Sequence, residues 1–432
     1  MRYLSTSGQS PPVDLATALL TGLAPDGGLY VPESLPRAEP LDSPPSELAA
    51  GAARVLAPFV RELPRAELEK LATDALDFTI PLVPLGEDLY LLELFHGPTL
   101  AFKDVGARFM ARLLARLTRD EPRRLTILVA TSGDTGSAVA HAFAGLPEIG
   151  VAILYPRGRV SALQEKQLTT AGPDVLALAV DGDFDDCQRL AKTAFADRAL
   201  SHELGLTSAN SINVGRLLPQ IVYYFHAAVQ LPDGSAPPLF STPSGNFGNL
   251  TAGLMARALG LACSGFVAAT NVNDSVPRYL AGGRFEPRPA RPTLSSAMDV
   301  GRPSNFDRMR WLFDDDVEAM RRVIQGSRHD DEATAGVIRE VHETSGRMLD
   351  PHTAVGLLGL REAREDRRGR GPGIVLATAH PAKFADEIEG ILGVRPELPR
   401  RLARCLERPG DSQPLAPDSR ALASKLLSFF RR

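Results

Sequence analysis

The sequence predicts an α/β protein built on mostly parallel sheets. Short apolar runs recur along the chain, and each is followed by a stretch with helical periodicity. Such runs are typical of strands buried on both faces, and strands that alternate with helices form right-handed crossovers between parallel neighbours. The length of 432 residues is enough for two or three domains. We therefore expect helices on both faces of each sheet.

The predicted elements follow one another in a regular order from about residue 90. Strands are expected at 125–130, 151–155, 175–180, 239–241, 265–270 and 373–378. Helices are expected at 137–145, 160–171, 185–198, 250–259 and 383–391. Residues 1–90 are predicted to form a separate N-terminal module, with helical patterns near 14–21 and 46–76. Residues 277–303 are rich in Pro, Arg and Gly and lack periodicity, which predicts a long functional loop.

The composition argues against several classes of function. A formal net charge of −4 provides no basic field for nucleic acid. The three cysteines form no CxxC pair and the eight histidines no HExxH motif, so neither a disulfide framework nor a metal site is indicated. No apolar run reaches the ~18–20 residues of a membrane span, and the first six residues lack the apolar core of a secretory signal. We expect a cytoplasmic protein without a metal.

Lys103 is unusual for its residue type and its position. Of the 48 basic residues only six are lysines and 42 are arginines, so this chain places arginine almost wherever a positive charge is needed. Lys103 lies in the Gly- and Pro-containing segment His96–Asp104, HGPTLAFKD. An arginine stays protonated in proteins, whereas a lysine amine can lose its proton and attack a carbonyl. The residues alone leave two interpretations open, a reactive amine and an ordinary surface lysine at the start of a helix.

Two turns rich in small residues each follow a predicted strand and precede a predicted helix. They are Ser132–Ser137, SGDTGS, and Ser244–Asn249, SGNFGN. Glycines let the backbone present several N–H groups in one direction, and the N-terminus of the following helix adds a positive potential. Each turn is a candidate phosphate cradle, and the pair predicts two anionic groups. For either turn alone, an ordinary strand–helix connection is the alternative.

These segments resemble those of the threonine synthase family. HGPTLAFKD is similar to the segment whose lysine forms a Schiff base with pyridoxal 5′-phosphate (PLP) in that family. The likeness continues along the chain in the family's order, through TGLAPDGGLYVP (21–32), SGDTGSA (132–138), SGNFGN (244–249), SAMD (296–299) and AHPAKF (379–384).

The resemblance implies the architecture of the fold type II, tryptophan synthase β-like PLP enzymes. That architecture has two three-layer α/β domains with mostly parallel sheets enclosing PLP, here with an additional N-terminal α/β module. We expect the N-terminal module at 1–90 and a small α/β domain carrying Lys103 at 91–220. A large α/β domain with the phosphate loop is expected at 221–392, and a C-terminal helical tail at 393–432.

The resemblance also implies roles for individual residues. Lys103 is expected to be catalytic and to carry the cofactor, and Thr378 to face the pyridine nitrogen. A neutral hydroxyl there makes the ring a weaker electron sink than an aspartate would. The PLP phosphate is expected on Gly245, Asn246, Phe247 and Asn249. Substrate binding is expected from Ser132, Thr135, Gly136, Asn213, Arg216 and Lys383.

The implied activity is that of a PLP-dependent lyase. It converts O-phospho-L-homoserine and water to L-threonine and phosphate by γ-elimination and β-hydration, the last step of threonine biosynthesis. One alternative is another fold type II PLP enzyme, such as a phospho-amino-acid lyase or a serine/threonine dehydratase. A less favoured alternative is a non-catalytic protein that binds phosphorylated ligands. The expected partner is the small-molecule substrate, with no nucleic acid or membrane, and the expected state is a monomer or homodimer.

Overall fold

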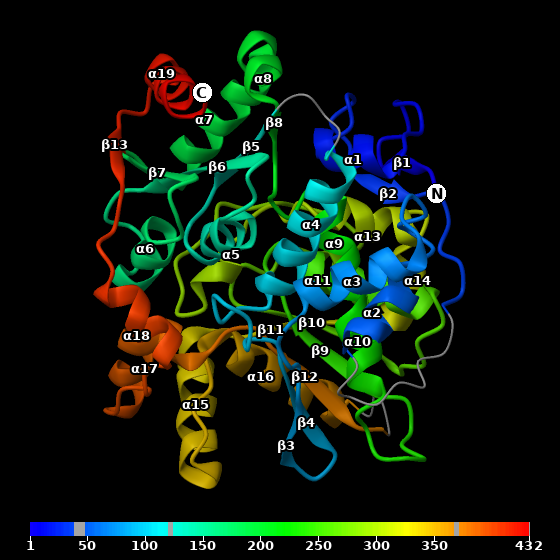
Figure 1. Cartoon of the computed structure of the whole chain (residues 1–432). Helices are drawn as coiled ribbons and strands as arrows, with labels where there is room; N and C mark the ends of the chain where they lie inside the picture. Colours follow the sequence, from blue (N-terminus) through cyan, green and yellow to red (C-terminus); the bar gives the residue numbers. More distant parts are fainter. Residues whose placement is uncertain (39–47, 120–123, 367–370, 432) are drawn as a thin grey trace. The chain divides into compact units, whose positions relative to one another are not determined.

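The computed structural model describes residues 1–38, 48–119, 124–366 and 371–431 (Figure 1). The chain divides into two compact units, each assembled from separate segments. Unit 1 comprises Met1–Tyr30, Lys103–Arg216 and Leu398–Arg432, and unit 2 comprises Val31–Phe102 and Leu217–Glu397. Each unit contains a mostly parallel sheet with helices, which confirms the predicted α/β class. The four-part division at residues 90, 220 and 392 remains a prediction.

Unit 1 is built on a five-stranded parallel sheet in the order β13-β7-β6-β5-β8. The strands are β5 (Leu125–Ala130), β6 (Ile149–Pro156), β7 (Val175–Val180), β8 (Leu206–Thr207) and β13 (Gln413–Leu415). All residues of β5, β6 and β7 are buried, as unbroken apolar runs predict. The C-terminal segment, which we expected to be helical, also contains β13, which extends the sheet beside β7.

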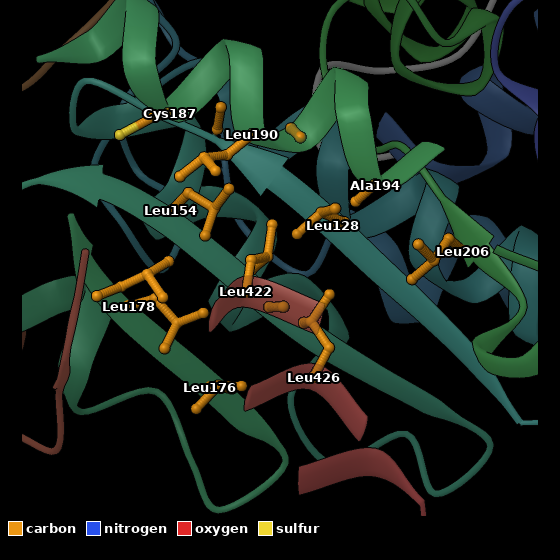
Figure 2. Close-up of a cluster of buried hydrophobic side chains, with 14 of the residues drawn as sticks. Leu128, Leu154, Leu176, Leu178, Cys187, Leu190, Ala194, Leu206, Leu422 and Leu426 are labelled. Atoms are coloured by element: carbon orange, nitrogen blue, oxygen red, sulfur yellow. The ribbon is translucent and has the colours of Figure 1, made fainter. Parts of the chain in front are cut away.

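Helices cover both faces of this sheet. The helices of unit 1 are α1 (Leu15–Thr21), α4 (Lys103–Leu117), α5 (Asp134–Phe143), α6 (Ala162–Thr169), α7 (Phe184–Ala196), α8 (Arg198–Leu204), α18 (Arg400–Glu407) and α19 (Ser419–Phe430), and the short α9 (Val214–Leu217) lies where the middle segment passes into unit 2. Figure 2 shows the core on one face, where Leu190 of α7 and Leu422 of α19 meet strand residues such as Leu154. Helices α5 and α6 pack on β6 and β7 from the other face.

Unit 2 is built on a six-stranded sheet in the order β11-β10-β9-β12-β4-β3. The strands are β3 (Leu82–Gly86), β4 (Leu89–Glu93), β9 (Leu239–Pro243), β10 (Gly265–Thr270), β11 (Ile324–Arg328) and β12 (Gly373–Ala377). Only the β3–β4 hairpin is antiparallel. The carboxyl ends of β9, β10 and β12 therefore meet at one edge of the sheet, where ligands bind in open α/β folds.

Among the helices of unit 2, α16 packs directly on this sheet and α15 packs against α16. Val337 of α15 and Leu357 of α16 share a core with strand residues such as Val375. The helices are α2 (Leu48–Leu56), α3 (Arg65–Ala75), α10 (Ile221–Ala228), α11 (Gly248–Ala258), α12 (Ser275–Gly282), α13 (Phe306–Leu312), α14 (Val317–Val323), α15 (Asp331–Ser345), α16 (Pro351–Glu365) and α17 (Ala385–Leu392). Three 3-10 turns complete the unit, η1 (Leu218–Gln220), η2 (Ser296–Met298) and η3 (Pro381–Phe384). The short strands β1 (Tyr3–Ser5) and β2 (Tyr30–Pro32) belong to the N-terminal part of the chain.

The structure changes several of the predicted boundaries. The expected loop at 277–303 begins inside α12, because residues 277–282 complete that helix. The expected helix at 383–391 begins two residues later, because residues 383 and 384 still belong to η3 and α17 begins at Ala385. The helical pattern near 46–76 corresponds to α2 and α3, and its residues 46 and 47 lie outside the described residues. Across the described ranges, no helix is long and apolar enough to cross a membrane.

Candidate active site

Lys103 lies beside a buried carboxylate in unit 1. It is the first residue of α4, and its Nζ is 3.7 Å from Oδ2 of Asp134, the first residue of α5. The side chain of Asp134 is only 4% exposed, and its Oδ1 accepts a hydrogen bond of 3.2 Å from Nε2 of Gln164. The structure thus joins the HGPTLAFKD and SGDTGS motifs. The sequence alone does not distinguish Asp134 as a site residue, although its position inside the second motif is a signal for one.

The turn at 132–137 is shaped by Thr131. Its Oγ1 accepts hydrogen bonds from the N–H groups of Gly133 (3.0 Å) and Gly136 (2.9 Å). A Cβ on Gly136 would lie 2.4 Å from Cγ2 of Thr131, so only glycine fits there. The N–H groups of Ser132 and Thr135 bond to no acceptor in the described part of the chain. An anion at this turn would therefore be bound by Ser132 and Thr135, with Gly136 contributing shape.

Arg216 packs against the first turns of α4. A Cβ on Gly106 would lie 2.6 Å from the Arg216 carbonyl oxygen and 3.3 Å from its Nε. The Arg216 Nη1 donates a 2.6 Å hydrogen bond to the carbonyl of Ala209. Burial lowers the pKa of Arg216 to about 10, and the charge of Asp104 opposes this shift. Arg216 therefore remains a cation at neutral pH, in the same unit as Lys103.

Asn213 uses most of its hydrogen-bonding capacity within the chain. Its amide donates to the carbonyls of Leu19 and Ser208, both at 2.8 Å, and its Oδ1 accepts from the N–H of Gly215 at 2.9 Å. Only one lone pair of Oδ1 is left for a ligand. Asn213 thus shapes the turn that carries Arg216, and its contact with a substrate remains a prediction.

In unit 2, the loop between β9 and α11 offers backbone donors. Phe247 is buried, has a φ of 59°, and stands at the N-cap of α11 without a side-chain capping bond. The N–H groups of Asn246, Phe247 and Gly248 have no acceptor among the described residues. Since the N-terminus of a helix also carries a positive potential, the loop is suited to a phosphate.

The two asparagines of this loop hold its shape. Nδ2 of Asn249 donates to the carbonyl of Pro243 at 2.8 Å, and its Oδ1 accepts from Oγ of Ser244 at 2.7 Å. Oδ1 of Asn246 accepts from the N–H and the hydroxyl of Ser304. The backbone N–H groups are therefore left for a ligand, together with Nδ2 of Asn246, which has no acceptor among the described residues.

Thr378 and Lys383 follow β12 at the carboxyl edge of the sheet. Thr378 is 6% exposed, and its carbonyl accepts from the N–H of Phe102 at 2.8 Å. Its hydroxyl has no partner within the part of the chain that the structure describes. Lys383 is buried, and its Nζ donates to the carbonyl of Thr99 at 2.9 Å. Lys383 thereby anchors the segment that leads to Lys103.

Asp299, the last residue of the SAMD motif, lies in a cluster of donors. Its Oδ1 accepts from Nδ2 of Asn271 (3.0 Å), Nδ2 of Asn273 (3.0 Å) and Oγ1 of Thr293 (2.7 Å). Its Oδ2 accepts from the N–H of Thr293 at 3.0 Å. Burial nevertheless raises the pKa of Asp299 from its ordinary value of 3.8 to about 6.

This shift predicts a pH-dependent contribution to stability. The folded protein binds the Asp299 proton more tightly than the unfolded chain, so the free energy of unfolding falls as pH rises from about 4 to about 6. After allowance for solvent screening we expect a change of ~1–2 kcal/mol. In Asp299→Asn this fall in the free energy of unfolding with rising pH should disappear. Urea unfolding at several pH values measures it. Equal slopes in the two proteins would contradict the assignment.

Comparison with known proteins identifies the family. Residues 79–379 match the pyridoxal-phosphate dependent enzyme family, and residues 2–76 and 353–424 match the N-terminal and C-terminal regions of threonine synthase. The chain is 45% identical to threonine synthase of Escherichia coli K12 over 99% of this chain and 100% of that protein. The chain belongs to the threonine synthase family. The relationship suggested by the motifs is thereby confirmed.

Solved structures of threonine synthases agree with this family at the level of the fold. The crystal structure of the Escherichia coli enzyme has a TM-score of 0.90 and 44% identity, covering 99% of this chain and 100% of that one. The PLP-bound enzyme from Brucella melitensis has a TM-score of 0.94 and 36% identity, with both chains covered completely. These matches confirm the predicted fold type II.

Proposed function

We propose that the chain is a threonine synthase, which converts O-phospho-L-homoserine and water to L-threonine and phosphate with PLP as cofactor. Similarity to threonine synthases over the full length supports this reaction. The structural observation that carries it is the lysine of the HGPTLAFKD motif, 3.7 Å from the carboxylate of the SGDTGS turn. As expected from the sequence, we also propose a cytoplasmic monomer or homodimer.

The available groups of the chain fit PLP. The loop of Gly245, Asn246, Phe247 and Asn249 offers N–H groups without acceptors for the phosphate. The hydroxyl of Thr378 is available to the ring nitrogen and supplies no charge there. Lys103 supplies the amine that would hold the cofactor covalently. When bound, PLP provides the electron sink for chemistry at the substrate carbons.

The remaining residues divide between proton transfer and substrate binding. The Lys103 amine would act as general base and acid, taking a proton from Cα and then from Cβ of the substrate. The carboxylate of Asp134 would hold the Lys103 ammonium in place between these transfers. The N–H groups of Ser132 and Thr135 are suited to the substrate carboxylate, and the guanidinium of Arg216 to its phosphoryl group.

The direct test is turnover of O-phospho-L-homoserine by the purified protein with PLP. Release of phosphate together with threonine is the expected result. L-Homoserine should react far more slowly, because it lacks both the leaving group and the charge that anchors the substrate. Equal rates for the two compounds would contradict a phosphate-binding site.

Replacement of Arg216 by alanine tests the assignment of the substrate phosphate. We expect binding of O-phospho-L-homoserine to weaken by ~1.5–3 kcal/mol, the contribution of a charge-assisted hydrogen bond. Inorganic phosphate should inhibit the wild type competitively and Arg216→Ala more weakly. Arg216→Lys serves as the matched control, because it keeps the charge and loses the planar fork. Loss of PLP with unchanged substrate affinity would show that the anion sites have been assigned to the wrong ligands.

A further inference from the structure

The phosphate-binding loop proposed above rests directly on the 3-10 turn η2. A Cβ on Gly245 would lie 2.8 Å from Cα of Met298 and 2.9 Å from the carbonyl oxygen of Ala297. Both distances are too short for a side chain, so the loop backbone is in close contact with η2. The position of η2 therefore sets the position of the loop.

The turn η2 is fixed from its other side by the core of unit 2 and by α16. The side chain of Met298 belongs to the hydrophobic core that includes Ile338 and Ala354. The N–H of Ala297 donates a 3.1 Å hydrogen bond to Nε2 of His352, in the first turn of α16. The chain between η2 and α16 is long, so this bond joins segments that are distant in sequence.

His352 is held in one orientation by Asp350. Its Nδ1 is 2.8 Å from Oδ1 of Asp350, and the two side chains are 4% and 1% exposed. Because the N–H of Ala297 can only donate, Nε2 must accept, and the ring proton is on Nδ1 and donated to Asp350. Asp350 also accepts a hydrogen bond from the N–H of His352 at 3.0 Å and caps α16. These bonds fix the orientation of its carboxylate.

We infer that the Asp350–His352 pair positions the loop 244–249 by holding η2 beneath it. The pair is therefore a positioning device for the phosphate of PLP, without touching the cofactor itself. The chain of contacts runs from the carboxylate of Asp350 through the His352 ring and the Ala297 N–H to the backbone of Gly245. The inference rests on the proposed function, in which this loop binds the cofactor phosphate.

The test compares the affinities of the apoenzyme for PLP and for pyridoxal, which lacks the phosphate. Both are measured by absorbance and fluorescence titration, and their ratio reports the contribution of the phosphate loop alone. His352→Phe keeps an aromatic ring but removes the hydrogen bonds to Ala297 and Asp350, so we expect this ratio to fall about tenfold. His352→Gln keeps an acceptor for the Ala297 N–H and should restore most of the ratio. The ³¹P resonance of bound PLP should shift in His352→Phe and return toward the wild-type position in His352→Gln.

The matched control is His329→Phe. His329 is a partly buried histidine of the same unit whose Nε2 is 2.6 Å from Oγ of Ser327 and 3.3 Å from Oε2 of Glu362, and within the described residues its ring makes no hydrogen bond to η2. Its replacement should leave the affinity ratio unchanged. Asp350→Asn, which keeps the helix cap, should lower the ratio about threefold and provides the test if His352→Phe does not fold.

Gly245→Ala separates failure of this inference from failure of the proposed function. Its Cβ would strike η2, so it should lower the same ratio if the loop binds the phosphate. A lower ratio in Gly245→Ala with an unchanged ratio in the His352 and Asp350 variants would overturn the inference and leave the proposed function intact. An unchanged ratio in Gly245→Ala would overturn the phosphate-loop assignment itself.

Discussion

Lys103→Ala is expected to have no measurable turnover while still binding PLP non-covalently. The amine is proposed to hold the cofactor and to carry every proton transfer, and no methyl group can replace it. The visible absorption band of the covalently held cofactor should be absent, and borohydride should fix no cofactor to the variant. Lys103→Arg should fail equally, because a guanidinium stays protonated at neutral pH.

A matched control is available in the same unit. Lys192 is exposed on α7, and Lys192→Ala should keep full activity and the wild-type absorption spectrum. Normal turnover by Lys103→Ala would contradict the role of this amine. Loss of activity in Lys192→Ala as well would point to a general effect of lysine removal on the fold.

Asp134→Asn is expected to lower kcat about 10²-fold, the lower part of the range attributed to positioned proton transfer. The substitution keeps the size of the side chain and removes the charge that faces Nζ of Lys103 at 3.7 Å. Because the pair is largely buried, the ammonium of the variant would lack its compensating carboxylate. Steady-state kinetics should show a larger effect on kcat than on KM, and PLP should stay bound.

Asp174→Asn provides the control for this prediction. Asp174 pairs with Arg124 at 2.7 Å in unit 1, where both side chains are about one-third exposed. Exposed ion pairs contribute little to the free energy of unfolding, so Asp174→Asn should fold as the wild type does. Since no catalytic role is proposed for Asp174, kcat should not change. If Asp134→Asn and Asp174→Asn had the same kcat as the wild type, the contact between Asp134 and Lys103 would have no part in catalysis.

The strands buried on both faces were the most predictable part of the fold. The runs at 125–130, 175–180 and 265–270 coincide with β5, β7 and β10, because an unbroken apolar run bounded by turns has few other structures available. The edge strands were missed. β11 reads IQGSR and has no apolar run, and β3 contains Pro84, which is tolerated at an edge but argues against a strand in sequence.

The sequence motifs predicted which segments form the candidate site. They did not predict which hydrogen-bonding groups of those segments remain for a ligand. The sequence predicts ligand contacts for the asparagines of the motifs, but the side chains of Asn213 and Asn249 bond to groups of their own chain. The N–H of Gly136 is likewise taken by Thr131. Such bonds depend on the folded path of the backbone, as when Asn213 meets Leu19 from a distant segment, and residue spacing does not report them.

The central claim is tested most directly by measuring all products of one reaction. Purified protein with PLP and O-phospho-L-homoserine should release L-threonine and inorganic phosphate in equal amounts, with the hydroxyl oxygen of threonine taken from ¹⁸O-labelled water. The threonine synthase reaction requires equal amounts of the two products and ¹⁸O in the threonine hydroxyl. A keto acid and ammonia in place of threonine would contradict it and identify the protein as a lyase or dehydratase of the same fold.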